Sequence, residues 1–121
     1  MSNLNVTTIS DLAGTGPVTL TKQSAAKAWV KSEDNGSSVQ ILQSVNISSV
    51  TDNATGDYTF GIGNSFTTAT YAVVASDDNS SARTATTSVA TASTVKGKSF
   101  ESSSGLSTFG KLSLILMGDL A

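Results

Sequence analysis

The fold is decided by residues 45–62, which read VNISSVTDNATGDYTFGI. In the first six positions strict alternation predicts that Ile47 and Val50 point to opposite faces of a strand. The last six positions, DYTFGI, place an apolar residue at every second site, which gives that strand one apolar face. Gly56 can adopt the positive φ that closes the turn between the two strands. The stretch therefore predicts an antiparallel β-hairpin.

The same period of two continues from Ala26 onward, and β-branched residues are frequent throughout. Clusters of Asn, Asp, Ser and Gly separate the apolar runs and are typical of turns. A helix over residues 22–29 is the alternative at the start of this region, but a helix of that length needs tertiary support. The pattern predicts an all-β domain, either a small antiparallel β-sandwich or a jelly-roll-like barrel. Its eight expected strands cover residues 26–31, 39–42, 45–50, 57–62, 71–76, 84–94, 96–101 and 111–117.

The chain of 121 residues has room for one domain of ordinary size. Its first part holds too few apolar residues to build a core of its own. We predict an extended N-terminal arm at residues 1–22, either flexible or docked on another molecule, followed by a β-sandwich module at residues 23–121. The apolar residues of the arm include Leu4, Val6 and Ile9, and a short extended piece at Val18–Leu20 follows the GTGP turn of residues 14–17.

Composition excludes most hydrolytic chemistry, because the chain contains neither Cys nor His. Their absence removes disulfides, Cys/His zinc sites, thiol nucleophiles and every triad that uses imidazole as its base. Residues 52–57, DNATGD, lack the ligand spacing of a calcium loop, and neither a nucleophile elbow nor a phosphate loop is present. We therefore expect no enzyme, no catalytic residues, no metal and no cofactor. The catalytic alternative is a glycosidase, whose pair of carboxylates would include Glu33 or Glu101.

The charge and hydropathy of the sequence argue against nucleic acid and the membrane interior as partners. The seven Lys and Arg residues are scattered singly and the net charge is −2, so the basic footprint of a nucleic-acid-binding protein is missing. No apolar run approaches the roughly 20 residues that span a bilayer, and the first residues lack the pattern of a signal peptide. We expect no nucleic-acid partner, no membrane insertion and synthesis in a reducing cytoplasm.

Ser and Thr make up 38 of the 121 residues, and they dominate the expected strand at residues 84–94, TATTSVATAST. Its small side chains contribute little to a hydrophobic core. No charged residue, which would oppose aggregation along an edge strand, lies between Arg83 and Lys96. An exposed edge strand is one interpretation, and pairing with another subunit is the favoured one. The chain has seven aromatic residues for its core, and the single Trp29 is expected among the buried ones, with stacking on a sugar ring as the alternative.

Three stretches carry a resemblance to a known family: KQSAAKAWV at residues 22–30, VNISSVTDNATGDYTF at residues 45–60 and YAVV at residues 71–74. In this order they resemble a recurrent module of tailed bacteriophages, cyanophage-like viruses among them, which occurs at tail-fibre tips and in small virion surface proteins. The resemblance implies a β-rich structural module, usually displayed as a trimer, without catalysis. Two loops depart from the family pattern and leave the ligand open: KSEDNG at residues 31–36 and TTAT at residues 67–70.

The favoured function is that of a structural virion protein, namely a capsid decoration (cement) protein. Its arm residues Leu4, Val6 and Ile9 are expected to dock on the major capsid protein by adding a strand to it. The β module would then form a homotrimer over the joints between capsid subunits, and the protein would be found in the virion after synthesis in the host cytoplasm.

The alternative is a receptor-binding tail-fibre tip or short fibre attached to tail proteins. In that case the surface loop at Asp77, Asp78 and Asn79 is expected to contact a host surface glycan. The two functions share the fold and the virion, and they differ in position on the particle.

Overall fold

The computed structural model describes residues 26–78, 83–101, 105–108 and 110–121 of the chain. The arm residues Leu4, Val6 and Ile9 and the loop residue Asn79 therefore lie outside the described residues. The described part contains strands and no helix. Its strands are β1 (Ala28–Asp34), β2 (Val39–Val45), β3 (Ile47–Ala54), β4 (Asp57–Ile62), β5 (Ala72–Asp77), β6 (Arg83–Thr91), β7 (Thr94–Glu101), β8 (Gly105–Leu106) and β9 (Lys111–Met117).

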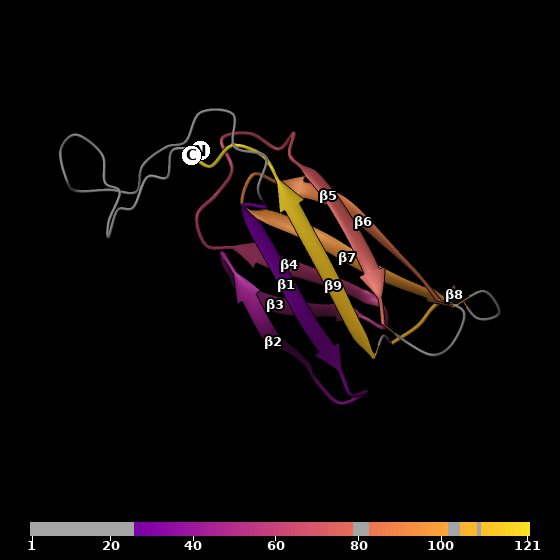
Figure 1. Ribbon diagram of the computed structural model, residues 1–121. Helices are drawn as coiled ribbons and strands as arrows, with labels where there is room; N and C mark the ends of the chain where they lie inside the picture. The colour runs from indigo at the N-terminus through magenta and orange to yellow at the C-terminus, as the bar shows by residue number, and fades with distance from the viewer. Residues whose placement is uncertain (1–25, 79–82, 102–104, 109) are drawn as a thin grey trace, which may run out of the picture.

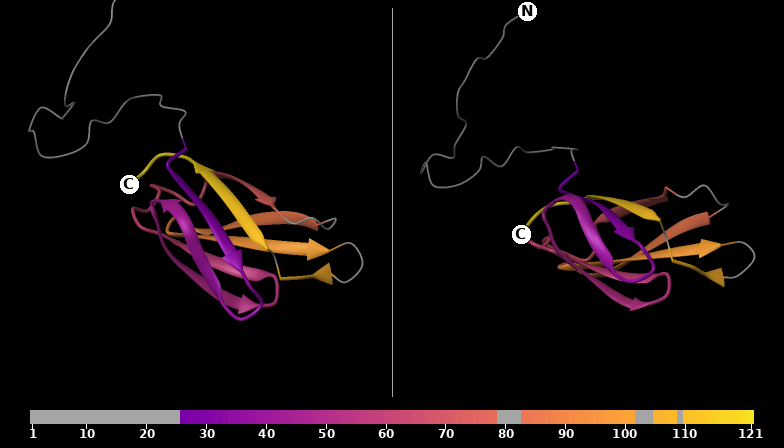
Figure 2. Two further views of the ribbon diagram at one scale, coloured as in Figure 1. Left: turned by 60° about the horizontal axis from the view of Figure 1, so that its bottom comes forward. Right: turned by 90° about the horizontal axis from the view of Figure 1, so that it is seen from below.

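The strands form two antiparallel sheets that pack face to face (Figure 1). One sheet has the strand order β2-β1-β9-β5, and the other has the order β3-β4-β7-β6, with β8 paired to β7. The prediction of an all-β antiparallel sandwich is confirmed. Because β1 pairs with β9, the chain enters the module and leaves it at the same end of the sandwich (Figure 2).

The sandwich has a proximal end and a distal end. The proximal end is the one where β1 begins at Ala28 and β9 ends at Met117. The distal end is the one where β1 ends at Asp34 and β9 begins at Lys111.

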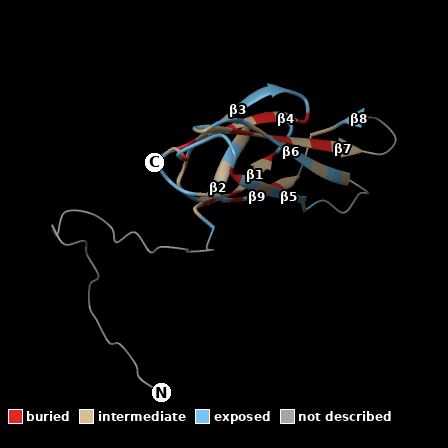
Figure 3. Ribbon diagram, turned by 90° about the horizontal axis from the view of Figure 1, so that it is seen from above, coloured by how far each residue is buried: buried red, intermediate tan, exposed pale blue. Residues whose placement is uncertain are grey.

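The core lies between the two sheets, where the buried positions of both layers face each other (Figure 3). The alternation expected from the sequence is clearest in β4 and β9, in which every second side chain is buried. Burying such a side chain contributes about 1.5–3 kcal/mol, so these two strands supply much of the hydrophobic stabilisation. The core comprises Ala28, Val30, Tyr58, Phe60, Ile62, Phe66, Tyr71, Val95, Leu112, Leu114 and Leu116.

The predicted hairpin is present, since β3 pairs with β4 and Gly56 adopts a φ of 69° in the turn. The expectation that Ile47 and Val50 face opposite sides is wrong. An irregularity in the ladder between Ile47 and Ser49 adds a residue to β3, and both Ile47 and Val50 pack against the core. The alternation of apolar and polar residues in the sequence does not predict such a β-bulge.

Val45 belongs to β2 and not to the following strand, because the chain turns a corner at Asn46 and passes from one sheet to the other. Asn46 has a φ of 56°, a left-handed conformation that Asn tolerates better than most residues. Its side chain supports the corner: Oδ1 accepts a hydrogen bond from the Asn64 amide at 2.6 Å, and Nδ2 donates to the Asn64 carbonyl at 3.0 Å. Val45 is thereby left on the outside of the four-stranded sheet.

The single strand expected at residues 84–94 is wrong in extent. The chain reverses within it, so that β6 ends at Thr91 and β7 begins at Thr94. The Thr91 hydroxyl accepts a hydrogen bond from the Ser93 amide at 3.1 Å, and this local contact supports a turn that contains neither Gly nor Pro. β6 forms the edge of its sheet and leaves small side chains exposed. Pairing of this edge with another subunit stays a prediction.

Candidate functional site

Trp29 lies on the outer face of the four-stranded sheet. In β1 the buried positions are Ala28, Val30, Ser32 and Asp34, and Trp29 takes an intervening, half-buried position. The expectation of a core position for Trp29 is therefore wrong, because the register of β1 gives the inward sites to the smaller residues.

Trp29 is part of a row of apolar side chains that crosses all four strands of this sheet. It is opposite Val45 in β2 and Ile115 in β9, and Ile115 is in turn opposite Val74 in β5. Val45 is 49% exposed, Ile115 44% and Val74 55%, and Met117 follows on the same face of β9 at 40%. We call these five residues the apolar patch. A sheet face turned to water normally carries polar side chains, so the patch is a candidate contact surface.

The apolar patch lies at the proximal end of its face, and Leu42, the unpaired residue at the β2 irregularity, is a separate exposed apolar residue farther along the same sheet. The next row toward the distal end is polar, with Lys31 opposite both Gln43 and Ser113. Lys31 also lies 3.5 Å from the carboxylate of Asp78. The chain enters the module beside the patch, where the Lys27 amide donates a hydrogen bond to the Leu116 carbonyl at 2.9 Å.

The outer face of the opposite sheet is more polar. Lys98 and Asp57 form an ion pair across β7 and β4 at 3.0 Å. The hydrogen bond from Lys98 holds the pKa of Asp57 below its ordinary value, against a smaller opposing effect of burial. Exposed Thr and Ser side chains follow along β6. The two outer faces of the sandwich thus differ in chemistry.

The distal end carries polar contacts inside the sandwich. The Tyr58 hydroxyl donates to the Asp34 carboxylate, and the Ser99 hydroxyl donates to the Asp77 carboxylate at 2.5 Å, so each pair joins one sheet to the other. Burial, followed by the contact with Asp34, raises the pKa of Tyr58 above its ordinary value. The Arg83 guanidinium donates a hydrogen bond to the carbonyl of Thr108, which follows β8 in the sequence.

Asp77 and Asp78 of the expected surface loop differ in how far they are exposed. Asp77 is half-buried at the end of β5, and its Oδ1 atom is buried without a hydrogen-bond partner among the described residues. Asp78 is exposed, and its amide donates to the Lys111 carbonyl at 2.8 Å. Of this pair, Asp78 is therefore the residue available for an outside contact.

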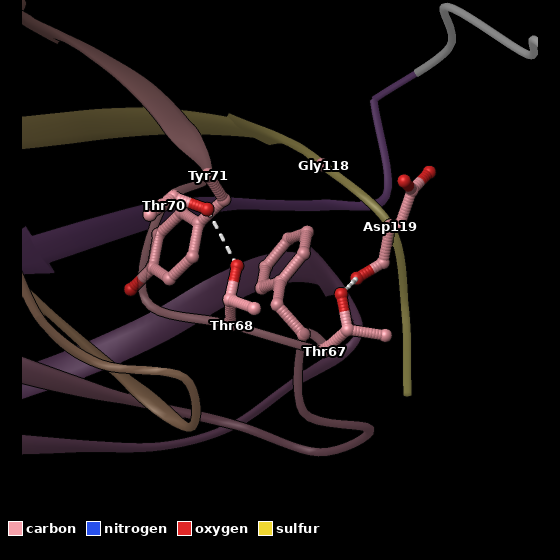
Figure 4. Close-up of a pocket in the computed structure, with 7 residues that line it drawn as sticks. Thr67, Thr68, Thr70, Tyr71, Gly118 and Asp119 are labelled. Carbon is pink, nitrogen blue, oxygen red and sulfur yellow. Dashed lines mark hydrogen bonds between the residues drawn. The ribbon is translucent and has the colours of Figure 1, made fainter.

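A small cavity of about 150 Å³ lies at the proximal end (Figure 4). Its wall includes the stacked rings of Phe66 and Tyr71, whose centroids are 4.3 Å apart, and the Phe66 ring and the Tyr71 Cβ atom lie against Gly118. The Thr67 hydroxyl donates to the Asp119 carbonyl at 3.2 Å, and Figure 4 shows the Asp119 carboxylate turned away from the threonines. No sequence motif predicts this cavity, because residues 67–70 stand out in the sequence only as a departure from the family pattern. It offers hydroxyl groups for hydrogen bonding, with room for a few water molecules.

Among the described residues, no three acidic side chains approach closely enough to hold a metal ion. Within the same residues, no helix is long and apolar enough to cross a membrane. Comparisons with protein-family models, with curated proteins and with solved structures found no match.

Proposed function

We propose that this chain is a structural, non-enzymatic protein of a tailed-bacteriophage virion, and specifically a capsid decoration protein. The observation that carries the proposal is the difference between the two ends of the sandwich. The chain enters at the proximal end beside the apolar patch, whereas the distal end has polar pairs in its interior and the exposed Asp78 on its surface. A module tethered at one end presents its opposite end outward, as a decoration protein does on a shell.

The attachment is assigned to the arm. Residues 1–25 precede the described module, and fully extended they reach about 80 Å. An arm of this length can lie along a capsid surface, and Leu4, Val6 and Ile9 can add a strand to a free sheet edge of the major capsid protein. Backbone groups that find no partner within an isolated arm are satisfied by such a contact.

The proposed homotrimer uses the edge strand β6. Its outward side chains are small, at Thr84, Thr86, Ser88 and Ala90, which permits close approach of a second chain. As the last strand in its sheet, β6 also has one side without a ladder in the described part of the chain. β5 of the other sheet lies beside β6 without forming a ladder with it, so the backbone groups along this edge stay available to a second chain.

The second candidate, a tail-fibre tip, is favoured by one feature of the distal end. Asp78 is exposed there at the end of β5 and forms an exposed ion pair with Lys31. Charged side chains at a free end suit contact with a host glycan. In that case the arm binds tail proteins, and the copy number is set by the tail.

Quantitative gel analysis of purified virions separates the two candidates. Hundreds of copies per particle support decoration of the capsid, and a few tens support a tail position. Deletion of residues 2–22 should abolish incorporation, and the substitutions Leu4→Ser, Val6→Ser and Ile9→Ser together should reduce it strongly. Thr7→Ser and Thr8→Ser together, in the same segment, serve as the matched control. Full occupancy after the deletion would overturn the proposed attachment.

A further inference from the structure

We propose that Val18 and Leu20, in the part of the chain that precedes the described module, fold back onto the apolar patch of their own module. The occupant is thus a segment of the same chain. This inference does not depend on the virion function, because it concerns only how the leading segment joins the sandwich.

The patch requires a cover. Val45, Val74, Ile115 and Met117 are each 40–55% exposed although they lie side by side on one face. Alternate residues of the same strands, such as Leu114 and Leu116, are fully buried. The sheet is therefore apolar on both faces at its proximal end, which is typical of a sheet covered on both sides.

The size of the patch points to a single segment as its cover. Its five residues are far fewer than the roughly 20–30 residues that each partner contributes to a stable protein interface. Across the sheet the row from Val45 to Val74 covers three strand spacings, or about 14 Å. An extended segment of about five residues spans this width, and Val18–Leu20 would occupy its middle. A second copy of the module would extend over the polar row at Lys31 as well.

The connection has the right length and direction. The Lys27 amide is held by the Leu116 carbonyl, so the chain leaves the module next to Met117. The six residues 21–26 link Leu20 to that point and reach about 20 Å when extended, which exceeds the width of the row. Val18–Leu20 can therefore lie on the patch without strain in the linker.

The sequence of the segment fits the same placement. Val18 and Leu20 share one face of an extended chain and stand about 6.7 Å apart, so they can settle on either side of one strand of the sheet. Pro17 lacks an amide hydrogen, and Gly14 and Gly16 are typical of turns, so the sequence predicts that the extended piece begins at Val18. In the sequence, residues 14–17 separate this piece from residues 4–9, so the two pieces can have different contacts.

Fluorescence of the intact chain tests the inference directly, because Trp29 is its single tryptophan and lies within the patch. In the full chain the emission should be blue-shifted and protected from acrylamide. The double variant Val18→Ser/Leu20→Ser should shift the emission to longer wavelength and raise the quenching constant. The double variant Leu4→Ser/Val6→Ser, with the same spacing and chemistry, should change neither.

Three outcomes would overturn the inference. The first is an emission maximum and quenching constant of the Val18→Ser/Leu20→Ser chain that equal those of the parent chain. The second is protection of Trp29 that appears only at concentrations where light scattering detects an oligomer, because a second copy would then be the cover. The third is protection that arises only on the assembled particle, which would assign the patch to another virion protein. Circular dichroism of each variant verifies that the sandwich is intact.

Discussion

The Tyr58 hydroxyl donates a hydrogen bond to the Asp34 carboxylate, and this contact joins β4 of one sheet to β1 of the other inside the sandwich. Tyr58 is fully buried, Asp34 is only 8% exposed, and the second carboxylate oxygen accepts the Gly36 amide at 2.8 Å. Both oxygens of a nearly buried carboxylate are thus hydrogen-bonded, which compensates the loss of water around it.

Tyr58→Phe should therefore destabilise the fold by about 1–3 kcal/mol, because Asp34 keeps its burial and loses a donor. Urea unfolding measures the change through a lower midpoint at unchanged slope. A double-mutant cycle with Asp34→Asn should give a coupling energy between the two sites. Additive effects of the two substitutions would mean that the contact contributes nothing to stability.

The raised pKa of Tyr58 predicts a loss of stability at alkaline pH. The neutral phenol is favoured in the folded state, and Tyr71, whose pKa burial also raises, behaves in the same way. The stability that both provide is fully present below the ordinary tyrosine pKa of 10.0 and is lost as the pH rises above it. Unfolding midpoints measured in urea should fall above about pH 10, and the fall should be shallower for Tyr58→Phe.

A direct control follows tyrosinate absorbance during a pH titration. In the folded chain both tyrosines should ionise later than in the chain unfolded by urea. Ionisation of either tyrosine at the same pH in both states would contradict the predicted shift for that residue.

Gly97→Ala should destabilise the sandwich by about 1–3 kcal/mol through overpacking. A Cβ atom at this position would lie 2.8 Å from Cδ2 of Leu112 and 3.3 Å from Cε2 of Phe60, and both neighbours are fully buried. Ala90→Val on the exposed edge strand β6 is the matched control and should stay within about 0.5 kcal/mol of the parent chain. Thermal or urea unfolding compares the two, and equal stability of both variants would refute the close contact.

Lys98→Met should return the pKa of Asp57 toward its ordinary value, because the hydrogen bond from Lys98 is the largest cause of the lowered pKa. A carboxyl titration by NMR measures this change. The stability effect should stay within about 1 kcal/mol, since the Lys98 side chain is 35% exposed and solvent screens the pair. It should be present at neutral pH and vanish in acid, where Asp57 is protonated in both chains. An unchanged titration of Asp57 would exclude Lys98 as the cause.

The candidate contact surface was only partly predictable. Exposed apolar residues in β-strands can be suspected from sequence, but Trp29 was expected in the core because a large aromatic residue usually buries. Its neighbours in the apolar patch come from β2, β5 and β9, so no local window contains the row. Asp77 likewise reads as a turn residue, and its contact with Ser99 exists only because the two sheets face each other at the distal end.

The sequence by itself determined which segments are extended and where most of them turn. Residues 57–62 and 111–117 were predicted with the bounds that β4 and β9 have. The alternation is strict in residues 57–62, and residues 111–117 form a local run with an apolar residue at every second position. The tertiary structure alone decided the bulge that turns Ile47 and Val50 to one side, the corner at Asn46 and the alignment of Trp29 with Ile115. Alternation defines the faces of one strand, whereas the partner and register of that strand depend on packing between residues more than eighty positions apart.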